Sequence, residues 1–228
     1  MPVFRNQSQF RARHEKKQDE GIRTVFQGRK KILIQGSLLF GSMLVGMWAV
    51  FSWMPTWIQS LLGEKDGQTE RSIAMMVLGL GGLAGGFASG WVARGLGIRR
   101  AMRLCFLACF VLALALFGLN RSFSPLIYAE TAALAVFFGI SQGLLASYIP
   151  QLFDVRIRGT ATGISYNAGR VITTAAVFFL GSLVALFGGY GNALLAFSFV
   201  FLPGLAILSL GPGAREGWVL HAKTNDSF

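Results

Sequence analysis

Six long apolar runs, separated by short gaps, occupy most of this 228-residue sequence. Each run has about 20 residues or more, the length that an α-helix needs to cross the hydrocarbon core of a bilayer. The composition agrees, because 53% of the residues are hydrophobic and 14% are charged, against about 45–50% and about 25% in soluble domains. The sequence therefore predicts an all-α, polytopic membrane protein built as a six-transmembrane-helix bundle.

The predicted organisation is a membrane domain between two polar tails. Residues 1–31 form a basic cytoplasmic tail or linker, residues 32–210 the bundle, and residues 211–228 a C-terminal tail. The expected spans are 32–62, 72–93, 101–119, 124–149, 160–187 and 190–210. The first 31 residues do not resemble a cleavable signal peptide, because they are polar and the following apolar run is too long.

The placement of Lys and Arg predicts the orientation. The chain has 21 basic and 10 acidic residues and a net charge of +11. The basic residues gather before the first run, after the second, fourth and last runs, while the opposite flanks hold only Lys65, Arg71 and Arg121. Cytoplasmic loops carry the excess of Lys and Arg, so we expect both termini on the cytoplasmic side of the membrane. Charges placed in this way indicate a lipid bilayer as partner rather than nucleic acid.

No pattern of catalytic or metal-binding residues is present in the sequence. Cys105 and Cys109 lie one helical turn apart in an apolar run and, without a His or third Cys nearby, are interpreted as packing residues. His14 and His221 lie in the tails. The sequence also lacks a nucleophile elbow, a phosphate-binding glycine loop and zinc-ligand spacing. We therefore predict neither an enzyme nor a bound metal or cofactor.

Small and aromatic residues suggest how the helices pack. The second run holds repeated glycines at three- and four-residue spacing between Gly79 and Gly90, a pattern that allows a neighbouring helix to approach closely. We expect this helix to be interior. Trp57, with Pro55, marks the outer end of the first run and is interpreted as an anchor in the interfacial aromatic belt.

Glu130 is one of two charged residues deep inside the predicted spans, since Arg103 lies at the start of its span and is counted with the preceding basic loop. A charge at that depth costs about 2.5–3.5 kcal/mol even on the lenient insertion scale, so each of the two is a candidate functional residue. Phe137, Ser141 and Tyr148 fall on the same side of the helix as Glu130, which indicates a semi-polar cavity wall. Glu130 then either carries protons, or faces the outer vestibule or bonds a neighbouring helix.

Arg170 is the second such residue and lies near the predicted bilayer midplane. Its neighbours within one helical turn are Tyr166, Asn167, Thr173 and Thr174. A guanidinium among hydroxyls and an amide is suited to binding a carboxylate. That carboxylate belongs to a substrate or to Glu130, and an inert buried pair is the alternative.

Two loop segments, GWVARGLGIRR at residues 90–100 and YIPQLFDVRIRGT at residues 148–160, resemble signatures of the major facilitator superfamily. The first resembles the Gly-rich loop after the second helix of each half, and the second resembles the signature between the fourth and fifth helices of the second half. With SYNAGR at residues 165–170, the chain is similar to bacterial sugar and metabolite:proton symporters, particularly those for organic acids. The resemblance covers nearly the whole chain and corresponds to the C-terminal six-helix half, with residues 1–31 as the inter-half linker.

The resemblance implies a secondary active transporter of a small metabolite, such as an organic acid or sugar, that is coupled to protons and alternates access between two six-helix halves. It also implies a bacterial inner membrane as the location, a missing N-terminal half or a second half-protein as partner, and a proton-coupling role for Glu130. The candidate substrate-binding residues are Arg170, Asn167, Tyr166, Ser141, Phe137 and Trp48. The residues of the cytoplasmic gate motifs are Gly90, Arg94, Gly97, Arg99, Arg100, Arg156, Arg158 and Gly159.

Three features depart from the family pattern, and one of them is a basic cluster of the first motif that is reduced to Arg99 and Arg100. Arg94 stands where the family has an acid, and Gln151 stands where it has Glu. Since those acids normally pair with arginines across the cytoplasmic gate, we expect gate closure to rest on fewer charge contacts. The alternatives to a transporter half are a non-transporting membrane remnant, a six-helix module whose basic tail binds anionic lipid or a partner, and a six-helix pore.

Overall fold

The computed structural model describes residues 30–210, and within this range every regular element is a helix. The helices are α2 (Lys30–Leu62), α3 (Gln68–Leu96), α4 (Ile98–Leu119), α5 (Leu126–Gln151), α6 (Arg158–Phe187), α7 (Tyr190–Ser198) and α8 (Phe201–Leu210). The all-α prediction is confirmed for these residues. Residues 1–29 of the predicted basic tail and the C-terminal tail lie outside the described range.

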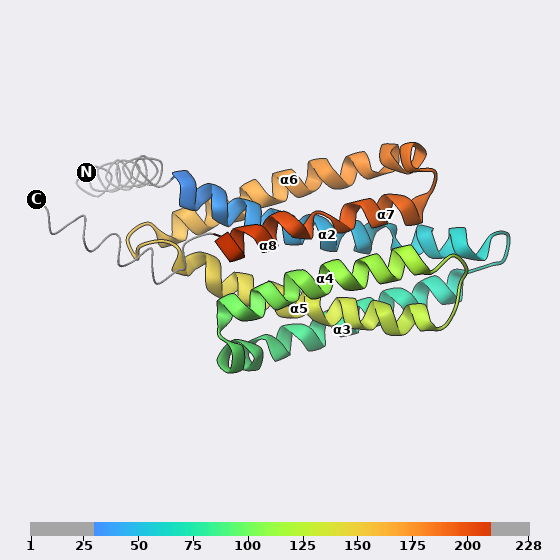
Figure 1. Ribbon diagram of the computed structural model, residues 1–228, viewed down its shortest axis with the longest axis horizontal. Coiled ribbons are helices and arrows are strands. Elements are labelled where there is room, and N and C mark those ends of the chain that lie inside the picture. Colours follow the sequence, from blue (N-terminus) through green and yellow to red (C-terminus); the bar gives the residue numbers. More distant parts are fainter. Residues whose placement is uncertain (1–29, 211–228) are drawn as a thin grey trace, which may run out of the picture.

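The helices lie along one common axis as an antiparallel bundle (Figure 1). By length and composition, five helical segments can cross a membrane, α7 and α8 together counting as one, and the bent helix α6 raises the number to six. The connections α3–α4 and α5–α6 lie at the same end of the bundle as the start of α2 and the end of α8 (Figure 1). The basic loops thus share one end of the bundle with both described ends of the chain.

The last predicted span, residues 190–210, is divided into α7 and α8 at Phe199 and Val200. Pro203 explains the break, because proline has no N–H to donate to the carbonyl four residues earlier, and its ring clashes with that carbonyl. The carbonyl in question is that of Phe199, which instead accepts a hydrogen bond of 3.1 Å from the backbone nitrogen of Leu202. The span therefore continues across a short, tightened turn.

Two pairs of helices pack at close range, α3 against α5 and α2 against α6. Glycines permit both contacts, since the missing Cβ lets two backbones approach. A Cβ added to Gly85 of α3 would overlap the carbonyl oxygen of Val136 on α5. In the second pair, a Cβ added to Gly169 of α6 would lie 3.1 Å from the backbone nitrogen of Gly41 on α2. These contacts hold in place the three helices that form the site described below.

The expectation that the second helix is interior is wrong for the described residues. Its Gly-rich face packs on α5, but the opposite face of α3 is apolar and exposed, with Phe87 73% and Trp91 67% exposed. Only Ala74, Leu78 and Gly85 of α3 are buried. The glycine pattern correctly indicates one close contact, but it carries no information about what covers the other face.

The interpretation of Trp57 as a belt anchor is also wrong. A belt tryptophan lies at the surface, with its polar edge among the lipid headgroups. Trp57 is 1% exposed, and its ring packs edge-on against Phe117 of α4, with 4.9 Å between ring centroids. Its indole nitrogen also lies close to Gly191, at the start of α7. Trp57 is therefore part of the bundle core.

We predict that Gly85→Ala destabilises the bundle whereas Gly86→Ala does not. The added methyl group at Gly85 meets the α5 backbone, whereas Gly86 has open space around it. Overpacking of this kind costs about 1–3 kcal/mol, so Gly85→Ala should lower the thermal midpoint of the detergent-solubilised protein by several degrees. Equal midpoints for the two variants would contradict the packing described for α3 and α5.

Candidate functional site

A pocket of about 1100 Å³ lies between α2, α5 and α6. It is somewhat larger than the roughly 300–1,000 Å³ usual for small-molecule sites. Helix α2 supplies most of the lining, α6 supplies the charged part, and α5 supplies one side chain. The lining residues are Phe40, Leu44, Met47, Trp48, Ser52, Trp53, Thr56, Gln142, Arg170, Thr173, Thr174, Val177 and Phe178.

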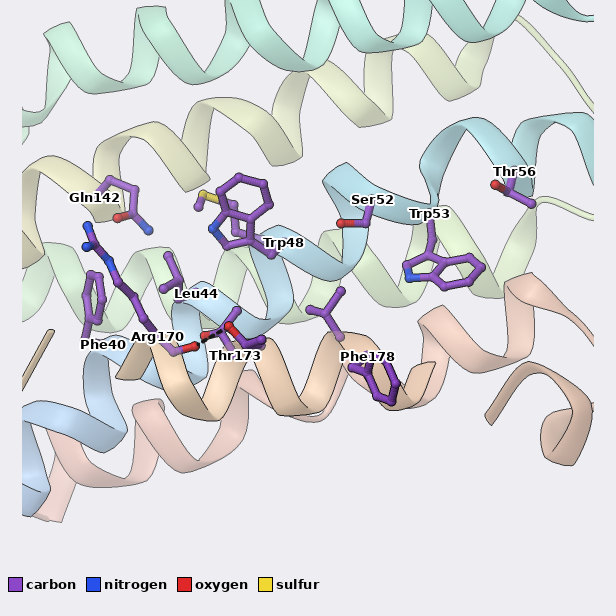
Figure 2. A pocket seen from close by; sticks show the side chains of 13 residues that line it. Phe40, Leu44, Trp48, Ser52, Trp53, Thr56, Gln142, Arg170, Thr173 and Phe178 are labelled. Atoms are coloured by element: carbon purple, nitrogen blue, oxygen red, sulfur yellow. Dashed lines mark hydrogen bonds between the residues drawn. The ribbon is translucent and has the colours of Figure 1, made fainter. Parts of the chain in front are cut away.

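The lining follows helical periodicity on both long helices. On α2 the positions Phe40, Leu44, Trp48, Ser52 and Thr56 recur every four residues, which places them in one stripe along the helix. The stripe is aromatic and aliphatic at the end near Phe40 and carries hydroxyls toward Thr56. Figure 2 shows these side chains, together with Trp53, along the length of the pocket.

Arg170 is the one charged residue of the lining. It lies about 18 Å along the axis of α6 from Arg158, at 1.5 Å per residue. Figure 2 shows its side chain extending from α6 across the pocket toward Gln142. Within residues 30–210 the guanidinium has neither a hydrogen bond nor an ion pair. An exposed cation near the middle of a membrane helix therefore has no partner from the described part of the protein.

The hydroxyls next to Arg170 do not compensate its charge. Thr173 Oγ1 donates to the backbone oxygen of Gly169 at 2.8 Å, and Thr174 Oγ1 donates to the backbone oxygen of Arg170 at 3.0 Å. Both hydroxyls therefore use their hydrogens within α6, and their oxygens remain as weak acceptors at the pocket wall. A bound anion would meet the guanidinium before it meets these hydroxyls.

Gln142 was not identified from the sequence. Its amide nitrogen is buried, with no hydrogen-bond partner among the described residues, which costs about 1–3 kcal/mol for a donor left unsatisfied. Three hydroxyls share this property, those of Thr131, Thr162 and Ser165, but none of them lines the pocket. The signal in the sequence was a single amide within a long apolar run, and a search restricted to charges does not detect it.

Of the six predicted substrate-binding residues, the pocket brings together Arg170 and Trp48. Asn167 is exposed outside the lining and donates from Nδ2 to the backbone oxygen of Gly163 at 2.9 Å. Tyr166 lies behind the wall, where its ring packs on Phe40 with 4.5 Å between centroids. The remaining two, Phe137 and Ser141, do not line this pocket either.

The predicted cavity wall on α5 is wrong for this pocket. Ser141 and Tyr148 are 1% and 2% exposed and belong to the bundle interior, and neither they nor Phe137 nor Glu130 line the pocket. The reason is helix rotation, because successive residues on a helix point about 100° apart. Helix α5 therefore turns Gln142 to the pocket, and its neighbour Ser141 points into the protein, where its hydroxyl donates to the backbone oxygen of Phe138.

Glu130 lies in the first turns of α5, away from Arg170. Its Oε2 accepts a hydrogen bond of 2.6 Å from Nδ2 of Asn120, the residue that follows α4. Glu130 is therefore hydrogen-bonded to the end of a neighbouring helix, and its proton-coupling role stays a prediction. A pair between Glu130 and Arg170 is not formed among the described residues.

The predicted gate residues belong to the end of α3, to the starts of α4 and α6 and to the connections that precede these two helices, and these connections lie at the end of the bundle that holds both described ends of the chain (Figure 1). Arg99 donates from Nε to the backbone oxygen of Leu208 at 2.9 Å, which links the first turn of α4 to the last turn of α8. Arg158 donates to the backbone oxygen of Phe153 at 3.4 Å. A positive charge at the carbonyl end of a helix is stabilising, so the contact of Arg99 with α8 strengthens this end of the bundle.

The other gate positions differ in their surroundings. Arg94 donates to the backbone oxygen of Gly90 in its own helix at 3.3 Å, and Arg100 and Arg156 are exposed. Gly97 has φ of +77° between α3 and α4, a conformation that favours glycine. Gly90 and Gly159 have open space around them. A structural need for glycine is therefore visible at position 97.

Comparison with known proteins places this bundle and its pocket in a family. A cis,cis-muconate transport protein of Acinetobacter baylyi is 30% identical over 185 residues, an alignment that covers 73% of this chain and 42% of that protein. The aligned part of the chain thus spans less than half the length of this relative. The model of the Major Facilitator Superfamily matches residues 3–177. With this match over most of the sequence and a bundle of apolar, membrane-length helices, the chain belongs to the Major Facilitator Superfamily of integral, multi-pass membrane proteins.

Proposed function

We propose that the chain is the C-terminal half of a proton-coupled transporter that carries a small organic carboxylate by alternating access. The observation that carries this proposal is the unpaired guanidinium of Arg170 in the wall of a largely apolar pocket. The proposed location is a bacterial inner membrane. In the proposed orientation, which follows from the distribution of Lys and Arg, both ends of the chain lie on its cytoplasmic side.

The chemistry of the pocket supports an anionic substrate. An arginine presents its donors as a planar fork that matches a carboxylate with two parallel hydrogen bonds. No acidic side chain lines the pocket to neutralise Arg170. An uncompensated cation near the membrane midplane is costly, and a substrate carboxylate would supply the missing partner.

The apolar walls support a substrate with a flat hydrocarbon body. Phe40, Trp48, Trp53 and Phe178 all line the pocket, and aromatic rings of this kind pack well on planar groups. The relative described above is a cis,cis-muconate transport protein, and muconate has two carboxylates joined by a conjugated chain. Muconate is therefore the first probe for this pocket.

A second six-helix unit is part of the proposal. Arg170, Thr174 and Ser52 are exposed on the open side of the pocket, where hydrocarbon would offer them no hydrogen bonds. A second unit would cover this side and supply the opposite wall, around which the two halves rock. The face of α3 at Phe87 and Trp91 is also apolar and exposed.

Arg170→Ala is expected to abolish uptake of cis,cis-muconate, measured with labelled substrate in cells that express the polypeptide as its native locus encodes it. A hydrogen bond to a charged group contributes about 1.5–3 kcal/mol, and the fork would make two of them to the carboxylate, so Vmax/KM should fall roughly 30-fold or more. Arg170→Lys keeps the charge, loses the fork and should be intermediate. Arg103→Ala, at an exposed arginine of α4 outside the pocket, is the matched control. Undiminished uptake by Arg170→Ala at equal expression would refute the assignment.

Glu130→Gln is expected to remove the pH dependence of uptake, because Glu130 is the proposed proton-coupling residue. The amide keeps the shape of the side chain and its contact with Asn120 but has no carboxyl proton to exchange. Uptake is measured between pH 5 and pH 8, with Glu64→Gln, at an exposed residue of the α2–α3 loop, as the control. A pH profile identical to that of the unmodified protein would reject Glu130 as the coupling site.

A further inference from the structure

Gln142 and Arg170 face one another across the pocket from different helices. Figure 2 shows the Gln142 side chain entering the pocket from α5 and the Arg170 side chain reaching toward it from α6. Gln142 is the side chain that α5 contributes to the lining. The two residues come from separate close-packed pairs, since α5 packs mainly on α3 and α6 on α2. Their juxtaposition therefore depends on how the two pairs are joined.

Both groups have hydrogens to donate and no acceptor. The Gln142 Nε2 atom is buried without a partner, and the Arg170 guanidinium has none within residues 30–210. Buried polar groups are nearly always paired, so the unpaired Nε2 atom of Gln142 calls for an explanation. Arg170 is exposed, and its unpaired charge is costly because it lies near the middle of a membrane helix. Two unpaired donor groups in the wall of one pocket are explained together by a ligand that brings only acceptors.

We propose that Gln142 is the second donor to the substrate carboxylate and sets the preference of the site for a carboxylate over its neutral amide or ester. This inference rests on the proposed function. The last torsion of a glutamine side chain is broad and roughly two-fold, so the amide nitrogen can turn from its buried position to the pocket. A carboxylate has about four lone-pair sites, enough for the fork of Arg170 and an N–H of Gln142 together.

The selectivity follows from counting donors and acceptors. A carboxamide presents its own N–H groups either to Arg170 or to the amide of Gln142, and the donor that it faces is left unpaired. An ester loses the negative charge and one acceptor oxygen. Sites that hydrogen-bond a substrate reject analogues that leave buried groups unpaired far better than apolar sites reject a changed shape. Gln142 thus adds discrimination that a single arginine, which also binds neutral carbonyl groups, does not supply.

The test uses Gln142→Leu and Gln142→Glu in the polypeptide encoded at the native locus. For Gln142→Leu, the KM for cis,cis-muconate should rise about tenfold or more with Vmax little changed, because a hydrogen bond to a charged group is lost. Gln142→Glu places a carboxylate beside Arg170 in the position proposed for the substrate and should abolish uptake. Gln35→Leu, at an amide of α2 that does not line the pocket, is the matched control and should retain the original KM.

Selectivity is the second measurement, because a merely structural role of Gln142 would not change it. The inhibition constants of muconate monoamide and dimethyl muconate are measured against uptake of labelled muconate. The inhibition constant of each analogue, divided by that of unlabelled muconate, should fall about tenfold in Gln142→Leu. Unchanged KM and unchanged ratios, with Arg170 still required, would overturn the role of Gln142 alone. An unmodified protein that takes up no muconate would overturn the carboxylate assignment and this inference with it.

Discussion

The hydrocarbon core of a membrane offers polar groups no hydrogen bonds, and this constraint determines where the side chains of the bundle point. Hydroxyls on several helices satisfy it within their own helix: Ser37 donates to the backbone oxygen of Leu33, and Ser198 to that of Leu194. Arg170 and the amide nitrogen of Gln142 do not. They lie in the same pocket, and this coincidence of two unsatisfied donors distinguishes the pocket from the rest of the interior.

Close helix packing makes this pocket possible. The glycine contacts between α3 and α5 and between α2 and α6 hold each pair at a short distance, so the bundle is tight within each pair. The pocket lies between the pairs, where α2 and α6 meet α5. The bundle is thus rigid within each pair, and the largely apolar pocket with Arg170 and Gln142 in its wall lies where the pairs meet.

Hydropathy predicts the helices well because each must bury a continuous apolar run in lipid, and the structure extends most predicted spans by a few residues. The break before α8 was also encoded locally, by Pro203, although it was not predicted. The sequence does not predict in the same way which face of a helix packs on its neighbour, because that face depends on contacts with residues far along the chain. For this reason α3 was wrongly expected to be interior, and Trp57 was wrongly placed at the membrane surface.

In the candidate site, too, the sequence predicts what a local signal encodes and misses what depends on contacts between helices. A charge in an apolar run is a strong signal, and it led directly to Arg170. Gln142 gives a weaker signal, and choosing it over Ser141 requires the rotation of α5, which no local pattern of the sequence contains. The stripe from Phe40 to Thr56 on α2 is visible in the sequence only after the pocket has shown which face of α2 matters.

The most direct test of the central claim, that the substrate carboxylate binds beside Arg170, is substrate protection of a thiol placed in the pocket. Thr174→Cys introduces that thiol at an exposed lining position, while the native Cys105 and Cys109 are buried and should react slowly. The account predicts that cis,cis-muconate slows methanethiosulfonate labelling of Thr174→Cys, at the concentrations that saturate uptake, and leaves labelling of Leu104→Cys on α4 unchanged. Labelling of Thr174→Cys at the same rate with and without saturating muconate would contradict it.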